Sequence, residues 1–482
     1  MLQDLLLQVS DALWAYVLIG ALLGCGLWFT WRSGFVQFRM LGEMVRLLAD
    51  SSLAQERKHK HVSSFQAFAV SVATRVGTGN LAGVATAIAV GGPGAVFWMW
   101  VIALIGAATA FVESTLGQLY KQRHEDSFIG GPAYYIRRGL HSRWMAALFA
   151  VLLTITFGLS YNSIQSNTIC SAMHEAFGFS PLGVGIVLTV LALIIVFGGI
   201  HRIARVSAVL VPLMAIGYFV LALVVVAMNI ELVPHVLKVI VQDAFGVGPM
   251  AGGGLGVTIM MGIKRGLFSN EAGEGSAPNV AATAAVSHPV KQGLIQSLGV
   301  FTDTLLVCSC TAFIILLSGL YTTPELNGIA LTQAALEYSV GSWGKLFIAL
   351  AILLFAFSSI IGNYYYGEAN VRYLLSEGEW TTKPDAVAVR GRRARDRVAI
   401  TVYRLLSGGV FVMLGALMSL DFVWSLGDLC MALLTACNLV AIVALSRHAF
   451  RLLDDYRDQK RRGIREPVFQ DGNWFSTTPT EQ

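Results

Sequence analysis

Long apolar runs separated by short polar segments are the feature of this sequence that most limits its fold. A helix that crosses a bilayer needs about 20 consecutive apolar residues, and runs of this length recur along the 482-residue chain. Charged residues make up only 13% of the sequence, whereas soluble domains carry about 25%. We therefore predict an all-α polytopic membrane protein. The same composition argues against nucleic-acid-binding proteins, disulfide-rich secreted domains and cytosolic enzymes.

The apolar runs predict eleven transmembrane helices. The first covers 12–31, and the other ten cover 65–90, 94–120, 144–173, 181–200, 206–228, 236–268, 294–319, 345–374, 398–420 and 424–446. We expect them to form one transmembrane domain over 1–446. Residues 447–482 are expected to form a cytoplasmic tail that is too short and polar to bury a core of its own. Because no Lys or Arg precedes the first run, a cleaved signal peptide is not expected.

Lys and Arg gather in every second segment between the predicted helices. These segments contain Arg32, Arg39, Arg46, Arg57, Lys58, Lys60, Lys121, Arg123, Arg137, Arg138, Arg143, Arg202, Arg205, Lys264, Arg265, Lys291, the basic residues of 372–397 and those of 447–465. The segments between them hold only Lys238 and Lys345. Because cytoplasmic loops collect basic residues, the alternation predicts an N-terminus outside the cell and a C-terminus in the cytoplasm.

Two glycine-rich interruptions fall inside predicted helices. Residues 75–80 (RVGTGN) interrupt the second helix, and residues 251–256 (AGGGLG) interrupt the seventh. Counted from the second helix, they lie in the first and sixth of ten spans, as a five-plus-five inverted repeat over 65–228 and 236–446 requires. An unwound turn exposes carbonyls to a small cation and N–H groups to a carboxylate. Close helix packing through small residues is the alternative explanation of these glycines.

Several longer motifs then resemble one known family. They are SVATRVGTGNLAGVATAIAVGGPGAVFWMW (71–100), GLFSNEAGEGSAPN (266–279), HPVKQG (288–293), DTLLVCSCTAFIIL (303–316) and FAFSSIIGNYYYGE (355–368). In this order they resemble the alanine or glycine:cation symporters, and the similarity runs from about 14 to 446. The resemblance implies a leucine-transporter-like fold of two inverted repeats with one extra N-terminal helix.

The resemblance also implies a function. It implies a multi-pass protein of the bacterial inner membrane that couples inward sodium movement to uptake of a small neutral amino acid, alanine or glycine first. Sodium would be the coupling ion, no other cofactor is expected, and lipid but no nucleic acid is an expected partner; the oligomeric state stays open. An enzyme is not expected, because the sequence lacks the H-E-x-x-H, G-x-S-x-G and P-loop motifs. A channel or sensor of the same fold would need a long regulatory domain, which the short tail does not provide.

The site residues follow from the resemblance, position by position. The main-chain N–H groups of Thr78 and Gly79 would hold the substrate carboxylate. Sodium would lie between the carbonyls of Ala73 and Val76 and the hydroxyls of Ser358 and Ser359. The remaining expected substrate contacts are Asn80, Gln165, Gly254, Ser359 and Asn363. Structural or gating roles are expected for Arg75, Gly77, Glu113 and Glu271, and Arg75 is expected to neutralise Glu113, Asp303 or Glu271.

Two positions depart from the family pattern. Asn363 stands where many relatives have a large aromatic residue, so glutamine, D-alanine or serine is an alternative cargo. Glu274 stands where the familiar pattern has methionine, and its effect on coupling stays open. Separately, protons are an alternative to sodium as the coupling ion. For Gln165, Ser358 and Ser359, ordinary hydrogen bonds between or within membrane helices are the alternative to ligand binding.

Overall fold

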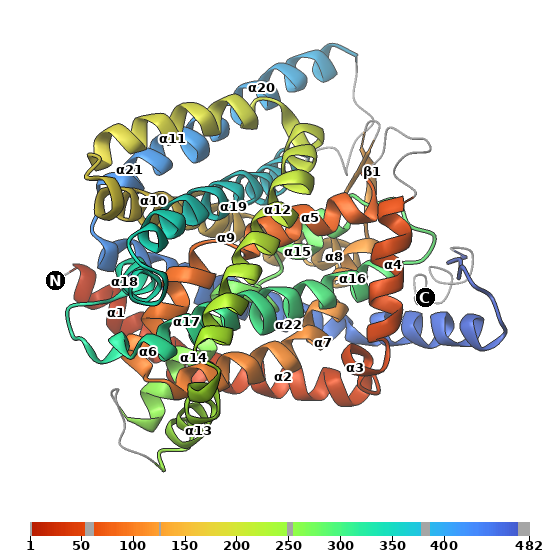
Figure 1. Ribbon diagram of the computed structural model, residues 1–482. Coiled ribbons are helices and arrows are strands. Elements are labelled where there is room, and N and C mark those ends of the chain that lie inside the picture. Colours follow the sequence, from red (N-terminus) through yellow and green to blue (C-terminus); the bar gives the residue numbers. More distant parts are fainter. Residues whose placement is uncertain (1, 54–61, 125–126, 248–253, 377–385, 471–482) are drawn as a thin grey trace.

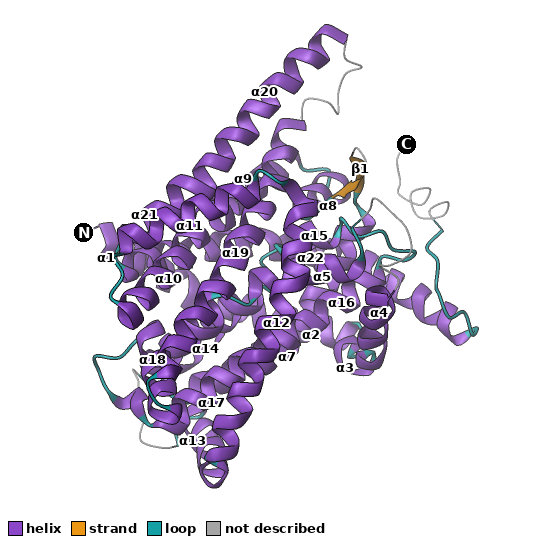
Figure 2. Cartoon of the chain, turned by 45° about the horizontal axis from the view of Figure 1, so that its top comes forward, coloured by secondary structure: helices purple, strands orange, loops and turns teal. Residues whose placement is uncertain are grey.

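The computed structural model describes residues 2–53, 62–124, 127–247, 254–376 and 386–470. Helices make up almost all of this part of the chain, together with one two-stranded hairpin (Figures 1 and 2). The elements are α1 Leu2–Leu13, η1 Trp14–Leu18, α2 Ile19–Arg32, α3 Val36–Arg39, α4 Leu41–Leu53, α5 Ser64–Arg75, η3 Gly79–Gly83, α6 Val84–Gly91, α7 Gly94–Leu119, β1 Gln122–His124, β2 Ser127–Ile129, α8 Pro132–Gly139, α9 Arg143–Ile155, η4 Thr156–Tyr161, α10 Asn162–Phe177, α11 Pro181–Val196, α12 Gly199–Met228, η5 Ile230–Leu232, α13 Val233–Ala244, α14 Leu255–Asn270, α15 Ala277–Ala281, α16 Val290–Val300, η6 Phe301–Cys308, α17 Ser309–Ser318, η7 Leu320–Thr322, α18 Gly328–Val340, α19 Trp343–Ser376, α20 Ala386–Leu405, η9 Leu406–Val410, α21 Phe411–Leu417 and α22 Leu420–Arg461.

The helices are those of a multi-pass membrane protein. Within the described residues, seven are long and apolar enough to cross a membrane, and an eighth span results if Ala215–Met228 and Ile230–Ala244, which meet at 80°, count as one. Gly79–Gly91 and Pro181–Val196 are shorter apolar helices. In Figure 1, α2, α7 and α22 run alongside one another through the molecule. Length and composition alone therefore do not reach the predicted count of eleven, because several predicted spans are divided.

Local sequence explains where helices begin. Ser63 forms a capping box before α5: its Oγ accepts from the Gln66 N–H at 3.1 Å, and the Gln66 side chain accepts from the Ser63 N–H at 3.0 Å. Such a box satisfies two N–H groups that a helix start leaves free. Prolines occupy the first turn of α8, α11 and α15, where the missing proline N–H costs nothing.

Two helices are interrupted where they meet. α5 ends at Arg75, Val76 and Gly77 are not helical, and the chain resumes through η3 into α6. α14 ends at Asn270, and 271–276 separate it from α15. α15 lies against α5 (Figure 1). The first predicted interruption is therefore present, and it faces a second one.

The break that faces α5 is not formed by the glycine-rich stretch 251–256. The predicted helix 236–268 is divided: α13 ends at Ala244, and α14 begins at Leu255. Gly254, with a φ of 96°, only precedes α14, and 248–253 lie outside the described residues. α14 ends through the chemistry of its last residues. The Ala272 N–H donates to Oδ1 of Asn270 at 3.0 Å, and the backbone of Glu271 has a left-handed φ of 57°.

Lys264 and Arg265 do not mark a loop, contrary to the sequence interpretation. Both lie inside α14 and are 4% exposed. Arg265 donates to the two carboxylate oxygens of Asp428 at 2.9 and 2.8 Å, and Lys264 Nζ lies 2.9 Å from the same carboxylate. A bidentate pair of this kind allows cations inside an apolar helix, so these two residues do not count toward orientation.

The last helix continues beyond its predicted end at 446. α22 extends to Arg461, and 464–470, which we call the return segment, then fold back against the loop before α16. Ser287 Oγ donates to the Pro467 carbonyl at 2.8 Å, and the Phe469 N–H donates to the Ser287 carbonyl at 2.8 Å. Lys291 pairs with Glu466, whose pKa this pair lowers. The return segment is thus tied to a loop far from it in sequence.

We predict that Gly415→Ala lowers the midpoint of thermal unfolding. A Cβ at Gly415 would lie 2.3 Å from the Ser163 carbonyl oxygen and 2.5 Å from its Cα, so α21 and α10 would be forced apart at a typical overpacking cost of about 1–3 kcal/mol. Gly24→Ala is the matched control, because nothing lies within 4 Å of its Cβ position. Equal midpoints for both variants in a fluorescence-monitored melt would contradict this close contact.

Candidate functional site

The break after Arg75 leaves main-chain carbonyls without helical partners. In a continuous helix the Ala73 carbonyl would accept from the Gly77 N–H. That N–H instead donates to Oδ1 of Asn80 at 2.8 Å, and the ψ of 93° at Val76 takes the chain out of the helix. Backbone oxygens released inside a membrane protein must find other partners.

Ser358 and Ser359 of α19 supply those partners. Ser359 Oγ donates to the Ala73 carbonyl at 2.9 Å and lies 3.4 Å from the Val76 carbonyl. Ser358 Oγ lies 3.3 Å from the Ala73 carbonyl. All four residues are buried. The structure therefore brings the four expected sodium ligands together as a cluster of neutral oxygens, a donor set that suits a small hard cation.

Gln165, which belongs to α10, lies next to the point where the helix resumes after the break, at Thr78. Its Oε1 accepts from the Thr78 N–H at 2.9 Å and from the Thr78 hydroxyl at 2.8 Å. Thr78 is 0% and Gln165 is 3% exposed, so this contact is closed to solvent on both sides. N–H groups at a helix start are partly positive and attract an oxygen acceptor. The resemblance assigns the Thr78 N–H to a carboxylate, and in this structure the acceptor is an amide oxygen.

Close approach requires the two glycines of the break. A Cβ at Gly77 would lie 2.3 Å from Ser359 Oγ and 2.9 Å from Gln165 Oε1. The absence of a side chain at Gly77 therefore lets Ser359 and Gln165 approach the same point of the chain. A Cβ at Gly79 would lie 3.1 Å from Phe268 and from the Ser269 Cα, so close helix packing also explains Gly79.

Glu113 and Glu271 hold the second break. Glu113 of α7 accepts from the N–H groups of Gly273 and Gly275 at 3.4 and 3.2 Å and from the side chain of Asn438 at 3.0 Å. Glu271 accepts from the Ser276 hydroxyl at 2.5 Å, and Thr74 Oγ1 of α5 lies 3.4 Å from the same oxygen. The Glu113 carboxylate thus replaces the carbonyl acceptors that these N–H groups would have in a helix. Glu271, through Thr74, connects the second break to the helix that ends at the first.

Asp303 braces the first break through Asn80. Its Oδ1 accepts from Nδ2 of Asn80 at 2.7 Å, and its Oδ2 accepts from the Ser269 hydroxyl at 2.7 Å. Because Oδ1 of Asn80 already accepts from the Gly77 N–H, both ends of this amide are engaged. The structure places Asn80 at the break as expected, with its side chain positioning the backbone.

Arg75 does not form the predicted ion pair within the described residues. Its NH1 donates to the Gln296 carbonyl at 3.2 Å, while Nε and NH2 have no hydrogen-bond partner among those residues. The guanidinium is nevertheless close enough to attract the carboxylates of Glu113, Glu271 and Asp303 through space. Arg75 therefore offsets the charge of several carboxylates without contacting any one of them.

Two aromatic residues that the sequence did not single out border the break. The Tyr161 and Phe268 rings lie 4.7 Å apart, and Phe268 packs where Gly79 lacks a side chain. The Tyr161 hydroxyl donates to Oε2 of Glu274 at 3.2 Å. Tyr161 precedes Gln165 by four residues, a spacing that puts both on one helix face and that could have predicted its position.

Of the two remaining expected site residues, Asn363 lies one helical turn from Ser359, whereas Gly254 lies away from the first break. Asn363 follows Ser359 by one turn of α19 and is 1% exposed, and neither end of its amide has a hydrogen-bond partner in the described residues. Gly254 is not brought to the break. Thr258, in the first turn after it, donates to the carbonyl of Gly91 at 2.7 Å, and Gly91 is the last residue of α6, at the other end of that half-helix from Gly79.

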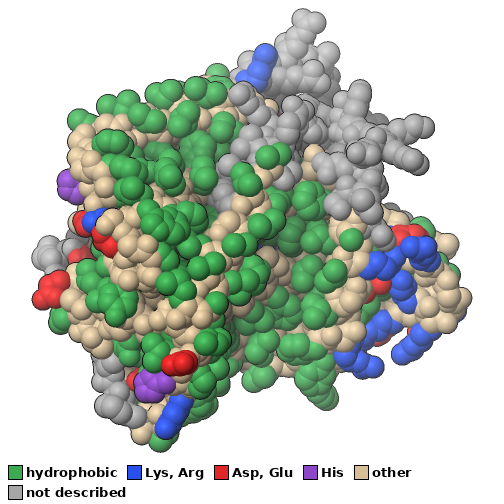
Figure 3. Space-filling view, in the orientation of Figure 1, with side chains coloured by type: hydrophobic (Ala, Val, Ile, Leu, Met, Phe, Trp, Pro, Cys, Tyr) green, Lys and Arg blue, Asp and Glu red, His purple; other side chains and the backbone are tan. Residues whose placement is uncertain are grey.

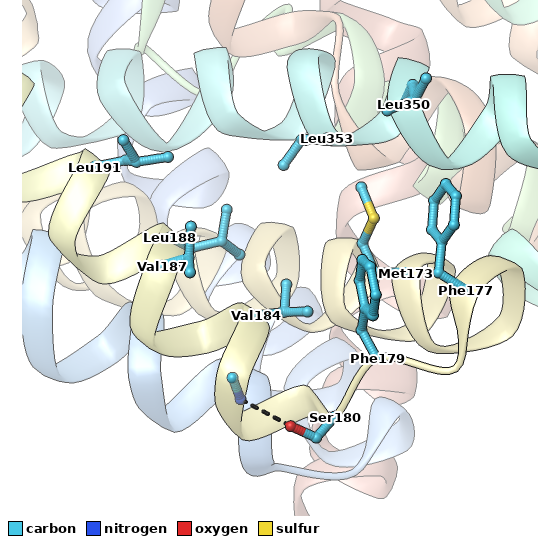
Figure 4. Close-up of a pocket in the computed structure, with 11 residues that line it drawn as sticks. Met173, Phe177, Phe179, Ser180, Val184, Val187, Leu188, Leu191, Leu350 and Leu353 are labelled. Carbon is cyan, nitrogen blue, oxygen red and sulfur yellow. Dashed lines mark hydrogen bonds between the residues drawn. The ribbon is translucent and has the colours of Figure 1, made fainter.

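An apolar cavity elsewhere does not resemble an amino-acid site. It measures about 510 Å³ and is lined by residues of α10, α11 and α19 such as Met173, Leu188 and Leu353 (Figure 4). Its one hydroxyl, that of Ser180, accepts from the Gly183 N–H at 3.2 Å. Such a lining offers nothing to hold a charged amino or carboxylate group.

Comparison with known proteins identifies the family of this chain. Residues 1–471 match the sodium:alanine symporter family. The probable sodium/glutamine symporter GlnT of Bacillus subtilis is 50% identical, over 95% of this chain and 91% of the relative. The amino-acid carrier protein AlsT of the same organism is 48% identical, over 96% and 94%. The sodium/alanine symporter AgcS of Methanococcus maripaludis is 35% identical, over 91% and 93%.

A solved structure supports the fold. MhsT, in a crystal structure in complex with L-phenylalanine, is similar with a TM-score of 0.50 over 81% of this chain and 99% of that chain, at 13% identity. At this identity the similarity concerns the leucine-transporter-like fold alone. The family match and the relatives, in contrast, extend over nearly the whole chain. The chain therefore belongs to the sodium:alanine symporter family, and it is a membrane transporter and not an enzyme.

Proposed function

We propose that this transporter couples inward sodium movement to uptake of a small neutral amino acid, alanine or glycine first. The observation that carries the proposal is the cluster of neutral oxygens from Ala73, Val76, Ser358 and Ser359 beside the helix start at Thr78, where Gln165 accepts the N–H. A cation in the cluster and a carboxylate at the Thr78 and Gly79 N–H groups would attract each other in a water-free site. Sodium would thus raise the affinity for substrate.

Substrate binding then requires Gln165 to release Thr78. The amide oxygen of Gln165 accepts both Thr78 donors. A carboxylate is a stronger acceptor than an amide, so we expect the substrate carboxylate to take these donors and turn Gln165 aside. The freed Gln165 amide would remain next to the substrate as a second contact.

The energy of sodium entry is sufficient for this task. One charge moving through 100 mV releases about 2.3 kcal/mol, and a tenfold sodium gradient adds about 1.4 kcal/mol. At a one-to-one ratio, the two together sustain an amino-acid gradient of several hundredfold.

We infer the architecture that goes with this function. The breaks at Val76–Gly77 and at 271–276 would be equivalent elements of inverted repeats over 65–228 and 236–446, with 12–31 as the extra helix of eleven spans. The remaining basic segments support an outside N-terminus and a cytoplasmic C-terminus in a bacterial inner membrane. The positions of Glu113, Glu271 and Arg75 support structural or gating roles.

Glutamine is a second candidate cargo. The 50% identical relative is named a probable sodium/glutamine symporter, and Asn363 offers a buried amide without a partner in the described residues. A side-chain amide of the substrate would supply both a donor and an acceptor to it. D-Alanine and serine are further alternatives of the same class.

Protons are a second candidate coupling ion. Oε1 of the buried Glu274 has no hydrogen-bond partner within the described residues. Because Tyr161 holds its other oxygen, Glu274 lies near the Gln165 side of the break. A buried carboxylate of this kind is a site where a membrane transporter holds a proton.

Uptake of radiolabelled alanine into proteoliposomes tests the proposal. An inward sodium gradient, an equal potassium gradient and a proton gradient would be compared, with glycine, D-alanine, serine and glutamine as unlabelled competitors. We expect concentrative uptake with sodium, and the competitor order assigns the cargo. Uptake driven equally well by potassium, or no uptake of any of these amino acids, would overturn the proposal.

We predict that Ser359→Ala raises the sodium concentration for half-maximal uptake at least tenfold, because it removes one hydroxyl ligand and the shorter of the two hydroxyl contacts to the Ala73 carbonyl. Ser376→Ala, at the end of the same helix, is the control; among the described residues its hydroxyl bonds to the Tyr373 carbonyl at 2.9 Å, away from the oxygen cluster. An unchanged sodium dependence in the Ser359 variant would show that the oxygen cluster does not bind the coupling ion.

If Asn363 contacts the cargo side chain, Asn363→Leu should weaken competition by glutamine more than competition by alanine. A lost hydrogen bond to a buried partner costs about 1–3 kcal/mol, which corresponds to a five- to hundredfold change in the glutamine inhibition constant. The alanine constant of the same variant is the internal control. An equal change in both constants would assign Asn363 to packing.

Glu274→Gln distinguishes the two coupling ions, since glutamine keeps the shape of the side chain but binds no proton at neutral pH. With sodium as coupling ion, the variant should retain most sodium-driven uptake and show no new pH dependence. Loss of uptake driven by a proton gradient, with sodium binding retained, would favour the proton alternative.

A further inference from the structure

A basic cavity lies at the end of the molecule where α22 stops. It measures about 400 Å³ and is formed by α3, the start of α4 and the last turns of α22. Its charged lining consists of Arg39, Arg457, Lys460 and Arg461 and one carboxylate, Glu43. We call these four cationic residues the basic cluster.

Glu43 does not neutralise the cluster, because its carboxylate is already engaged. It accepts from Arg46 at 2.7 Å and from the Tyr456 hydroxyl at 2.6 Å, and Lys460 lies 3.2 Å away. Partial burial raises the pKa of Glu43, but these three hydrogen bonds lower it to about 2. Of the cluster, Glu43 thus balances Lys460 alone.

The arginines of the cluster lack a strong anionic partner within the described residues. Arg457 donates to the neutral carbonyl of Ser33 at 2.7 Å, and no hydrogen bond or ion pair joins the Arg39 side chain to another described residue. Arg461 pairs with Asp458, but their side chains are 79% and 56% exposed, and such pairs contribute little.

Two of these guanidinium groups converge on one point. NH1 of Arg457 and NH1 of Arg39 lie 3.7 and 3.8 Å from the position where a Gly34 side chain would begin. Burial lowers the pKa of Arg457, and the like charges of Arg39 and Arg461 lower it further against the opposing effect of Asp454. The fold therefore keeps like charges together, an arrangement that an anion between them would stabilise.

The cavity borders a hydrophobic surface with the character of a membrane interface. Trp31, Phe35 and Phe38, on and between α2 and α3, are 71%, 49% and 46% exposed. Aromatic residues gather at the level of lipid headgroups. Figure 3 shows Lys and Arg side chains concentrated at this end of the molecule, on the right of the view, next to a hydrophobic face.

We propose that the basic cluster binds the phosphodiester headgroup of an anionic phospholipid, whose acyl chains lie along the exposed aromatic residues of α2 and α3. Arginine guanidinium groups match phosphate oxygens in bidentate geometry. Basic pockets beside membrane helices hold anionic headgroups in this way. The hydrophobic border favours a lipid over free phosphate, which would gain nothing from Trp31 and Phe35.

Native mass spectrometry of the purified full chain tests the site. The protein would be titrated with phosphatidylglycerol or with phosphatidylcholine of identical acyl chains. We expect at least fivefold more bound phosphatidylglycerol, and loss of this preference in the double variant Arg39→Gln/Arg457→Gln. The matched control is Arg143→Gln/Arg451→Gln, which removes the same charge from two exposed arginines outside the cavity.

The outcomes separate the possible ligands. Equal loss of preference in both double variants would mean that overall charge attracts the lipid, and it would overturn the proposal. Displacement of phosphatidylglycerol by millimolar inorganic phosphate would show that the site recognises phosphate alone, which also overturns it. If the double variant does not fold, the single Arg39→Gln variant is decisive, because the Arg39 side chain has no bond to another described residue that its loss would break; an unchanged preference there would refute the site.

Discussion

A backbone that leaves the helix inside a membrane protein must find hydrogen-bond partners without water, and buried carboxylates supply them here. Glu113 accepts the N–H groups of Gly273 and Gly275. Asp303 fixes Asn80, which in turn accepts the N–H of Gly77. Without these acceptors, each break would leave buried polar groups unpaired at a cost of about 1–3 kcal/mol each. The two unwound segments exist because α7 and η6 bring acidic side chains to them.

In the same arrangement, the groups that hold the unwound backbone differ from the groups of the proposed cation site. Carboxylates take the N–H groups of the second break and the side chain of Asn80. Within the described residues, the side-chain groups that bond to the carbonyls of Ala73 and Val76 are the hydroxyls of Ser358 and Ser359. The oxygen cluster is therefore neutral, and its desolvation costs far less than that of a charged one. The negatively charged groups, the carboxylates of Glu113, Glu271 and Asp303, do not belong to the cluster, and Arg75 offsets their charge through space.

The sequence was sufficient for the elements that depend on local chemistry. Apolar runs indicated the membrane helices, and RVGTGN located the first break because glycine and an asparagine cap act within a few residues. The resemblance grouped Ala73, Val76, Ser358 and Ser359, which lie together in the structure although no pattern of spacing links them. The inverted repeat, the span count and the roles of the site residues stay predictions.

The features that the sequence did not predict depend on contacts between residues far apart in the chain. The break that faces α5 follows Asn270 and is held by Glu113, whereas the glycines at 251–256 precede or begin α14 and lie in part outside the described residues. Lys264 and Arg265 look like loop residues until Asp428, more than 160 positions later, is known to face them. The return segment was missed for the same reason, since hydropathy contains no information about partners in other helices.

The return segment has a consequence for how the protein is made. Ser287 and Pro467 are 180 residues apart, so the loop before α16 emerges from the ribosome long before its partner exists. Contacts this distant in sequence form late, because the intervening chain must first be ordered. During synthesis this loop can already pair with earlier parts of the chain, because the Val62 carbonyl accepts from the Ala285 N–H and Lys121 Nζ donates to the Ala284 carbonyl at 2.8 Å. Final closure of this end of the transporter therefore belongs to the last stage of its biosynthesis, after all the membrane helices have been translated.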